Sequence, residues 1–369
     1  MALPPDACSL IAEYVADSRS TLVNLCTVSK QFQVAAERAI YNTLYLRGHD
    51  TTISVCDVLS RTPRVAMLVT ALSVYDAEDS DDESDFQPED GYWQVLHQAL
   101  KRTAYLRSLD LYFNTGDPPD RAWILDECKF QLRTFHCGLV WDDHLATFLS
   151  TQPYLSDLFI ADYPESAAEV MAPPIIPSDS TFLPKLSILE CTFSEAAVSL
   201  VPGRPVCRVK TCFTRSKLEE KREELNSIVS ALRRSKKRFR AIDIADSLYT
   251  AEFSMELLST VTSDAQFCVD LRYVGTLVLP VDGRQRLEFY TMLMRLRRLR
   301  CLELDVSDWD PAPTHLAALR ALTYELRLYC PSIVTVVYVH DFERHLVRMV
   351  DHVAICDEDA VTDNLWREV

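Results

Sequence analysis

Long apolar runs and paired cysteines are both missing from this 369-residue sequence, and glycine is scarce at seven residues. No stretch of 18 or more uncharged apolar residues occurs, so we expect no membrane-spanning helix, and the N-terminal region does not resemble a signal peptide. So few glycines disfavour the glycine-rich loops that hold phosphates in nucleotide-binding enzymes. The twelve cysteines are scattered singly, which is typical of reduced, buried thiols in the cytosol or nucleus.

An excess of basic charge is lacking as well. The formal net charge of −16 would repel nucleic-acid phosphates, whose binding depends on Lys and Arg, so we expect no nucleic-acid partner. Hydrophobic residues make up 48% and charged residues 25% of the chain, which is the composition of an ordinary folded protein.

Sequence motifs of enzymes were sought and none was found. The sequence has no G-x-S-x-G, no phosphate-binding loop, no H-E-x-x-H and no G-x-G-x-x-G. We therefore predict no catalytic residue and no cofactor. Possible zinc ligands have spacings that fit no usual site, so we expect buried thiols and surface histidines instead. These residues are Cys207, Cys212, His136, His340, His345 and His352.

The first 46 residues predict three short helices. Pro5 and Asp6 suit the first turn of a helix that runs to about Val15, because proline has no N–H to leave unpaired there and a carboxylate favours that helix end. A second helix follows, and Ser29 is placed to cap the third. Their apolar residues recur at three-to-four-residue spacing. They include Leu22, Leu25, Cys26, Phe32, Ala35, Ala36, Ala39 and Ile40.

This segment, LPPDACSLIAEYVADSRSTLVNLCTVSKQFQVAAERAIYNTLYL, resembles the F-box of fungal proteins, particularly the basidiomycete kind. It follows their pattern of LP-x-[ED], then TL-x-x-L-x-x-VS-[KR]-x-[FW], and departs from it at Ala7 and Val15. The resemblance implies that residues 1–46 dock to a Skp-type adaptor and through it to the cullin core of an SCF ubiquitin ligase. The adaptor-binding residues that it implies are Leu3, Pro4, Ile11, Leu22, Leu25, Val28, Ser29 and Phe32. The alternative is a helical cap that only covers the end of a repeat array.

Beyond residue 46, segments of the form apolar-x-x-apolar-x-apolar recur at a mean spacing of about 29 residues, near the length of leucine-rich repeats. Several follow a helical stretch and a proline or basic turn, which is the unit of an α/β solenoid. Residues 47–369 resemble the irregular leucine-rich-repeat-like domains that follow such F-boxes. The predicted segments begin at Tyr41, Val69, Leu106, Leu132, Leu155, Leu186, Val206, Phe239, Val274, Leu299 and Ile333.

The strict pattern L-x-x-L-x-L occurs twice, beginning at Leu106 and at Leu299. In a strand, alternate side chains share a face. We therefore expect Leu109 and Leu111 to be buried, with Asp110 and Tyr112 facing solvent. By the same argument Leu302 and Leu304 are predicted to be buried, and Glu303 and Asp305 to face solvent.

Three stretches interrupt the repeats. Residues 76–90 are strongly acidic and predict a loop that acts as a solvated spacer; the alternative is a phosphorylation site, because Ser80 and Ser84 would suit an acid-directed kinase. Residues 164–181 are rich in proline and lengthen one connection. Residues 215–240 predict a charged helix that buries Leu218, Leu225, Ile228 and Leu232. It ends in a basic run that we expect to complement the negative end of that helix, and the alternative is a nuclear address or a phosphate-binding patch.

The predicted function is that of a substrate receptor, without chemistry of its own, acting in the cytoplasm or nucleus. The F-box would hold the ligase core and the solenoid an unidentified target protein, so that the two come close together. A repeat scaffold outside any ligase is the alternative. A hydrolase or transferase with a site assembled from scattered residues is a third hypothesis.

Overall fold

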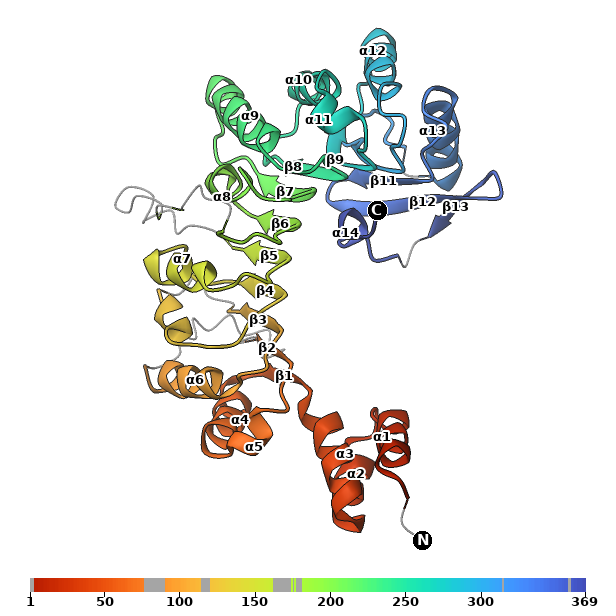
Figure 1. Cartoon of the computed structure of the whole chain (residues 1–369). Helices are drawn as coiled ribbons and strands as arrows, with labels where there is room; N and C mark the ends of the chain where they lie inside the picture. The colour runs from red at the N-terminus through yellow and green to blue at the C-terminus, as the bar shows by residue number, and fades with distance from the viewer. Residues whose placement is uncertain are drawn as a thin grey trace. The chain divides into compact units, whose positions relative to one another are not determined.

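The computed structural model describes residues 3–75, 90–113, 120–161, 174, 176, 181–313, 315–357 and 360–369. The chain forms two compact units (Figure 1). The first unit comprises Met1–Pro177 and Thr181–Lys185, and the second comprises Ser178–Ser180 and Leu186–Val369. The predicted acidic and proline-rich loops lie almost wholly outside the described residues.

The first unit begins with three helices, α1 (Pro5–Tyr14), α2 (Arg19–Val28) and α3 (Lys30–Tyr41). Pro5 occupies the first turn of α1, and the Ser29 side chain accepts a hydrogen bond from the Phe32 N–H at the start of α3, as its capping role predicts. The three helices share a small core made of Cys8, Ala12, Leu22, Ala35 and Ala36. These helices agree with the predicted ones, whereas their assignment to the F-box family stays a prediction.

A parallel sheet follows in the first unit, with its strands in chain order. Helices cover one face of this sheet, and the opposite face is called the first open face (Figure 1). The strands are β1 (Thr43–Arg47), β2 (Ala71–Tyr75), β3 (Ser108–Tyr112), β4 (Thr134–Cys137) and β5 (Asp157–Ile160). The helices are α4 (His49–Arg61), α5 (Pro63–Ala66), α6 (Asp90–Arg102), η1 (Ala122–Leu125) and α7 (Asp143–Ser150).

The second unit repeats this plan and closes it with two antiparallel strands. The parallel strands are β6 (Ile188–Cys191), β7 (Arg208–Cys212), β8 (Ala241–Ala245), β9 (Tyr273–Val278), β10 (Cys301–Asp305) and β11 (Thr335–His340). The antiparallel strands are β12 (Glu343–Val350) and β13 (Val353–Asp357). The helices are α8 (Ser194–Leu200), α9 (Leu218–Arg233), α10 (Ala251–Thr262), α11 (Ala265–Cys268), α12 (Gly283–Leu293), α13 (Leu316–Tyr329) and α14 (Leu365–Glu368).

The parallel strands agree closely with the predicted segments. Ten of the eleven segments begin two residues before a strand of β1–β11, and the segment predicted at Val274 lies inside β9. The apolar residue that starts most segments precedes its strand and is buried, as Leu106, Leu132 and Leu299 are. The prediction of strands that recur in an α/β repeat array is confirmed, and these strands are parallel.

Main-chain hydrogen bonds join successive repeats just before each strand. The carbonyl of Arg107 accepts from the N–H groups of Arg133 and Thr134, and the carbonyl of Arg240 accepts in the same way from Arg272 and Tyr273. Arg272 then accepts from the next repeat. This repeated pairing fixes the register between neighbours while the connecting loops vary in length.

The predicted alternation holds in β3 and only partly in β10. Leu109 and Leu111 are completely buried, and Asp110 and Tyr112 are half-buried on the first open face. In β10, however, Glu303 is only 2% exposed, so the prediction that it faces solvent is wrong. Residues from β9 and β12 contact it, as described below.

The predicted charged helix is shorter than expected. Helix α9 ends at Arg233, and the Ser235 hydroxyl donates to the carbonyl of Val206 at 2.7 Å, which turns the chain. Leu218 is exposed, whereas the other three predicted apolar residues are buried. Part of the basic run pairs with acids from later repeats: Arg233 with Asp264 at 2.6 Å and Arg238 with Asp270 at 3.8 Å.

Candidate functional site

The predicted adaptor-binding residues divide into exposed and packed side chains. Leu3, Pro4, Ile11, Val28 and Ser29 are exposed on or beside helices α1–α3, so they are available to a partner. This exposure follows from the helical period, which turns Cys8 and Ala12 inward and leaves Ile11 outside.

The other three predicted residues support the helices from inside. Leu22 is 2% exposed and belongs to their shared core, and Leu25 and Phe32 pack against that core. Their apolar spacing serves internal packing, so Leu22 is not exposed on this surface, and its role in adaptor binding stays a prediction.

Four further exposed apolar side chains lie on these helices and were not among the predicted site residues. They are Leu10, Tyr14, Val23 and Val34, and Tyr14 is 91% exposed. Tyr14 and Val23 would have been found by asking which apolar residues fall outside the helical core stripe. Together with the exposed predicted residues they make the surface of α1–α3 rich in apolar side chains, and we call it the helical surface.

A row of polar side chains crosses the first open face. Ser73 donates to Asp110 at 2.7 Å, and Asp110 lies 3.1 Å from His136 Nδ1. His136 Nε2 lies 3.7 Å from Asp157. Burial alone would lower the pKa of His136, but its interactions with the negative charges of Asp110 and Asp157 outweigh burial and raise the pKa to about 9. His136 is therefore a protonated, charge-paired residue at neutral pH.

Aromatic side chains lie beside this row on the same face. The Tyr75 and Tyr112 rings stack with centroids 5.3 Å apart, and Phe159 lies 6.0 Å from Tyr112. Tyr45 on β1 is well exposed. Tyrosine offers an apolar ring with a polar end, so this face suits contact with another protein.

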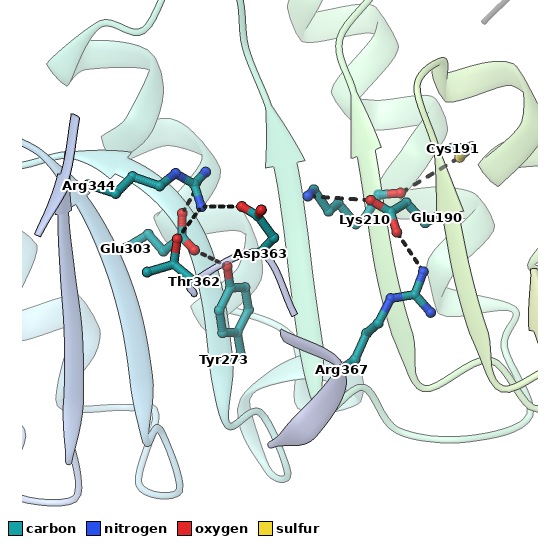
Figure 2. A network of polar contacts seen from close by, with 9 residues as sticks. All are labelled: Glu190, Cys191, Lys210, Tyr273, Glu303, Arg344, Thr362, Asp363 and Arg367. Atoms are coloured by element: carbon teal, nitrogen blue, oxygen red, sulfur yellow. Dashed lines mark hydrogen bonds and ion pairs between the residues drawn. The ribbon is translucent and has the colours of Figure 1, made fainter. Parts of the chain in front are cut away.

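A second polar cluster lies on the corresponding face of the second unit, centred on Glu303 (Figure 2). Tyr273 donates to Glu303 Oε1 at 2.5 Å, and Thr276 donates to Oε2 at 3.1 Å. Arg344 on β12 lies 3.5 Å from the same carboxylate. These partners explain how a carboxylate can be buried within an apolar sheet. Burial, and then the negative charges of Asp243 and Glu303, raise the pKa of Tyr273 well above its usual value.

Asp243 lies beside this cluster on β8 and is 5% exposed. Among the described residues, its Oδ1 has no hydrogen-bond partner. Burial raises the pKa of Asp243 to about 7, and the neighbouring Glu303 adds to the rise. Gly275 makes room for this carboxylate, because a Cβ there would fall 1.9 Å from Asp243 Oδ1.

Residues 360–369, which include α14, lie against this same face, and we call them the strap. Arg367 pairs with Glu190 at 2.5 Å, and Arg344 contacts Thr362 at 3.3 Å and Asp363 at 3.7 Å (Figure 2). The strap also buries the Trp366 ring. Glu190 pairs in addition with Lys210 at 3.4 Å. The face of β6–β10 is therefore covered, whereas no strap-like segment is seen on the first open face within the described residues.

Only weak signals in the sequence point to this cluster. Asp243 and Glu303 each stand between apolar residues in a short strand, where a charge is unusual. Gly275 is one of few glycines and lies opposite Asp243. A search for isolated acids in apolar strands would have found the two carboxylates, but their partners come from distant segments.

Across the described part of the chain, no group of three or more His, Cys, Asp or Glu residues could hold a metal ion. A small apolar space of about 10 Å³ lies between β8, β9 and α10, and an open groove runs between α10 and α12. The hypothesis of an enzyme with an unadvertised site stays untested.

The fold defines a stacked α/β repeat protein with parallel strands in chain order. No protein family matches the chain, and no curated protein matches it. Among solved structures it is similar to the leucine-rich repeat-containing protein LegL7 from Legionella pneumophila. The identity is 14%, the TM-score is 0.39, and the match covers 79% of this chain and 87% of that protein. A likeness of that size assigns no family. No helix among the described residues is long and apolar enough to cross a membrane.

Proposed function

We propose that the chain is an F-box substrate receptor, in which helices α1–α3 bind a Skp-type adaptor of an SCF ubiquitin ligase and the repeats hold a target protein. The observation that carries the proposal is the helical surface. Three short helices expose many large apolar side chains there, including Leu10, Tyr14 and Val28. Concentrated exposed apolar area on a folded protein marks a protein-binding surface.

The size of the helical segment supports the same proposal. Its internal core consists mainly of small residues such as Cys8, Ala12 and Ala36, so it buries little apolar area by itself. It contacts the following repeat through the ion pair between Glu37 on α3 and Arg64 on α5. A partner on the exposed side would bury the rest.

The target would contact the repeats. The first open face offers Tyr45, Tyr75, Tyr112 and Phe159, and tyrosine-rich surfaces favour protein recognition. By joining both surfaces in one chain, the receptor would raise the local concentration of target lysines near the ligase, which requires no catalytic group of its own. The expected place of action is the cytoplasm or nucleus.

The test is binding of the purified full chain to a purified Skp-type adaptor by calorimetry. Val28→Asp, and separately Leu3→Ala with Pro4→Ala, should weaken binding at least about tenfold, since loss of a central apolar contact costs 1–2 kcal/mol or more. Unfolding should change by less than about 0.5 kcal/mol, because these side chains are exposed. Phe342→Ala is the matched control, because that ring is also exposed but lies in the second unit.

Failure of the unaltered chain to bind any Skp-type adaptor would refute the ligase proposal. The alternative, a repeat scaffold outside any ligase, would then be favoured, and the first open face would be its binding surface. Tyr112→Ala should in that case weaken binding to the scaffold's partner, while substitutions on α1–α3 leave it unchanged.

A further inference from the structure

The strap covers the face of β6–β10 that lies opposite the helices of the second unit. Trp366 packs against Ala241 on β8, Tyr273 on β9 and Cys301 on β10, which lie side by side in register. These residues point away from the helices, because the alternate residues Ile242 and Val274 line the space beneath α10. The strap therefore crosses several strands on the side opposite the helices.

Polar contacts hold the strap at both of its ends. At one end Arg344 on β12 donates to Thr362, and at the other Arg367 pairs with Glu190 on β6 (Figure 2). Arg208 on β7 donates to the main-chain oxygen of Val369 at 2.6 Å. The strap is thus seated in an extended site that runs from β12 to β6.

We call this site on the sheet the seat of the strap, and the packing of the strap in it leaves buried polar atoms unpaired. Trp366 is 1% exposed, yet among the described residues its Nε1–H has no acceptor, and Asp243 Oδ1 on β8 has no donor. The only regular structure in the strap is the single turn α14, which has almost no stability of its own. A segment that leaves buried polar atoms unpaired and depends on its seat can be exchanged for a better-fitting one.

We propose that the face of β6–β10 is a peptide-binding surface, that the strap occupies it within the chain, and that its partner is a protein segment presenting an aromatic side chain followed directly by an arginine. The chemistry of the seat sets this partner. Tyr273, Ala241 and Cys301 form an apolar floor for a ring, and Glu190 supplies a carboxylate for a cation. Arg367 lies over the Trp366 ring at 4.5 Å, so ring and cation arrive as one unit.

The inference does not depend on adaptor binding by α1–α3. It concerns the second unit alone, and each proposal could fail without the other. It predicts that the strap opens without unfolding the repeats, and Cys301 under Trp366 reports such opening. Cys330 is the internal control: it is also buried in the second unit, with its thiol directed to the carbonyls of Leu293 and Leu296 on the helical side.

The experiment measures alkylation of each thiol in the native full chain by iodoacetamide and peptide mass mapping. In Trp366→Ala with Arg367→Ala, labelling of Cys301 should rise at least about tenfold, while labelling of Cys330 stays within about twofold. A synthetic peptide of residues 360–369, AVTDNLWREV, should return Cys301 labelling towards the unaltered rate. The control peptide carries alanine for the tryptophan and glutamate for the arginine, and should not protect.

A milder pair of variants guards against loss of folding. Arg367→Glu should open the strap by repulsion from Glu190, and adding Glu190→Arg should close it again. Equal rises at Cys301 and Cys330 would show that the strap is part of the cooperative fold and would overturn the proposal. So would a rise at Cys301 that the AVTDNLWREV peptide cannot reverse.

Discussion

Replacing Asp243 by asparagine should stabilise the protein, and only above acidic pH. Asp243 is buried, and the pKa of its carboxyl is raised to about 7 from an ordinary 3.8. The folded state therefore holds a proton that the unfolded state has already released. The folded protein is therefore not penalised by this carboxyl below pH 3.8, where the group is protonated in both states. As pH rises from 3.8 through about 7, the buried carboxylate progressively lowers the free energy of unfolding. Asparagine has nearly the same shape, keeps the space over Gly275, and carries no charge.

The size of the effect follows from the shift. About three pKa units at 1.36 kcal/mol each set an upper limit of about 4 kcal/mol. Lys210 and Arg344 lower the pKa of Asp243, whereas Glu303 and Glu190 raise it, and all four charges remain in the variant. We therefore expect Asp243→Asn to raise the free energy of unfolding by about 2–4 kcal/mol at pH 8 and by less than about 0.5 kcal/mol at pH 4.

Urea melts of the full chain at pH 4, 6 and 8 measure this directly. Asp341→Asn is the matched control, because Asp341 is exposed in a turn with φ 47, which asparagine also tolerates. Its stability should follow that of the unaltered chain at every pH. Two results would refute this reasoning: a lower free energy of unfolding for Asp243→Asn at pH 8, or an equal increase at all three pH values. Either would show that the buried, charged carboxylate of Asp243 does not destabilise the folded protein.

Two further predictions concern the first unit. His136→Gln should lower the free energy of unfolding by about 1–3 kcal/mol at pH 6.5 and by less at pH 9.5, because a raised histidine pKa gives stability that is lost as pH rises through about 9. Urea melts test this against an exposed control, His315→Gln, and an equal loss at both pH values would contradict it. Leu109→Ala should cost about 2–5 kcal/mol because the side chain is fully buried, whereas Asp110→Ala should cost about 1 kcal/mol through its bonds to Ser73 and His136; equal costs in denaturant melts would contradict the alternation of β3.

The parallel strands were predictable because their signal is local. A buried leucine such as Leu106 precedes each strand, and side chains then alternate with period two, so the pattern needs no knowledge of distant residues. The helix caps were predictable for the same reason: Ser29 bonds to an N–H only three residues away. Element types and order along the repeats therefore follow from short windows of sequence.

The rest depends on long-range contacts. The burial of Glu303 requires Arg344 and Tyr273, which come from other repeats, so alternation within β10 alone gives the wrong answer. The hairpins around β12 were missed because their tight turns use Asp341–Phe342 and Asp351–His352 at positive φ, without the glycine that usually marks such turns. On α2, the apolar spacing could not separate Leu22 in the core from Val28 on the surface.

The order of the parallel strands bears on how this chain folds during synthesis. In each unit the parallel strands that pair with each other follow one another in the sequence. No repeat must therefore wait for a distant partner, and each new repeat can add to a template that has already left the ribosome. The strap is the exception, because Arg367 meets Glu190 across 177 positions of sequence. The seat of β6–β10 is thus formed before the strap is made, and stays open to any other segment during that interval.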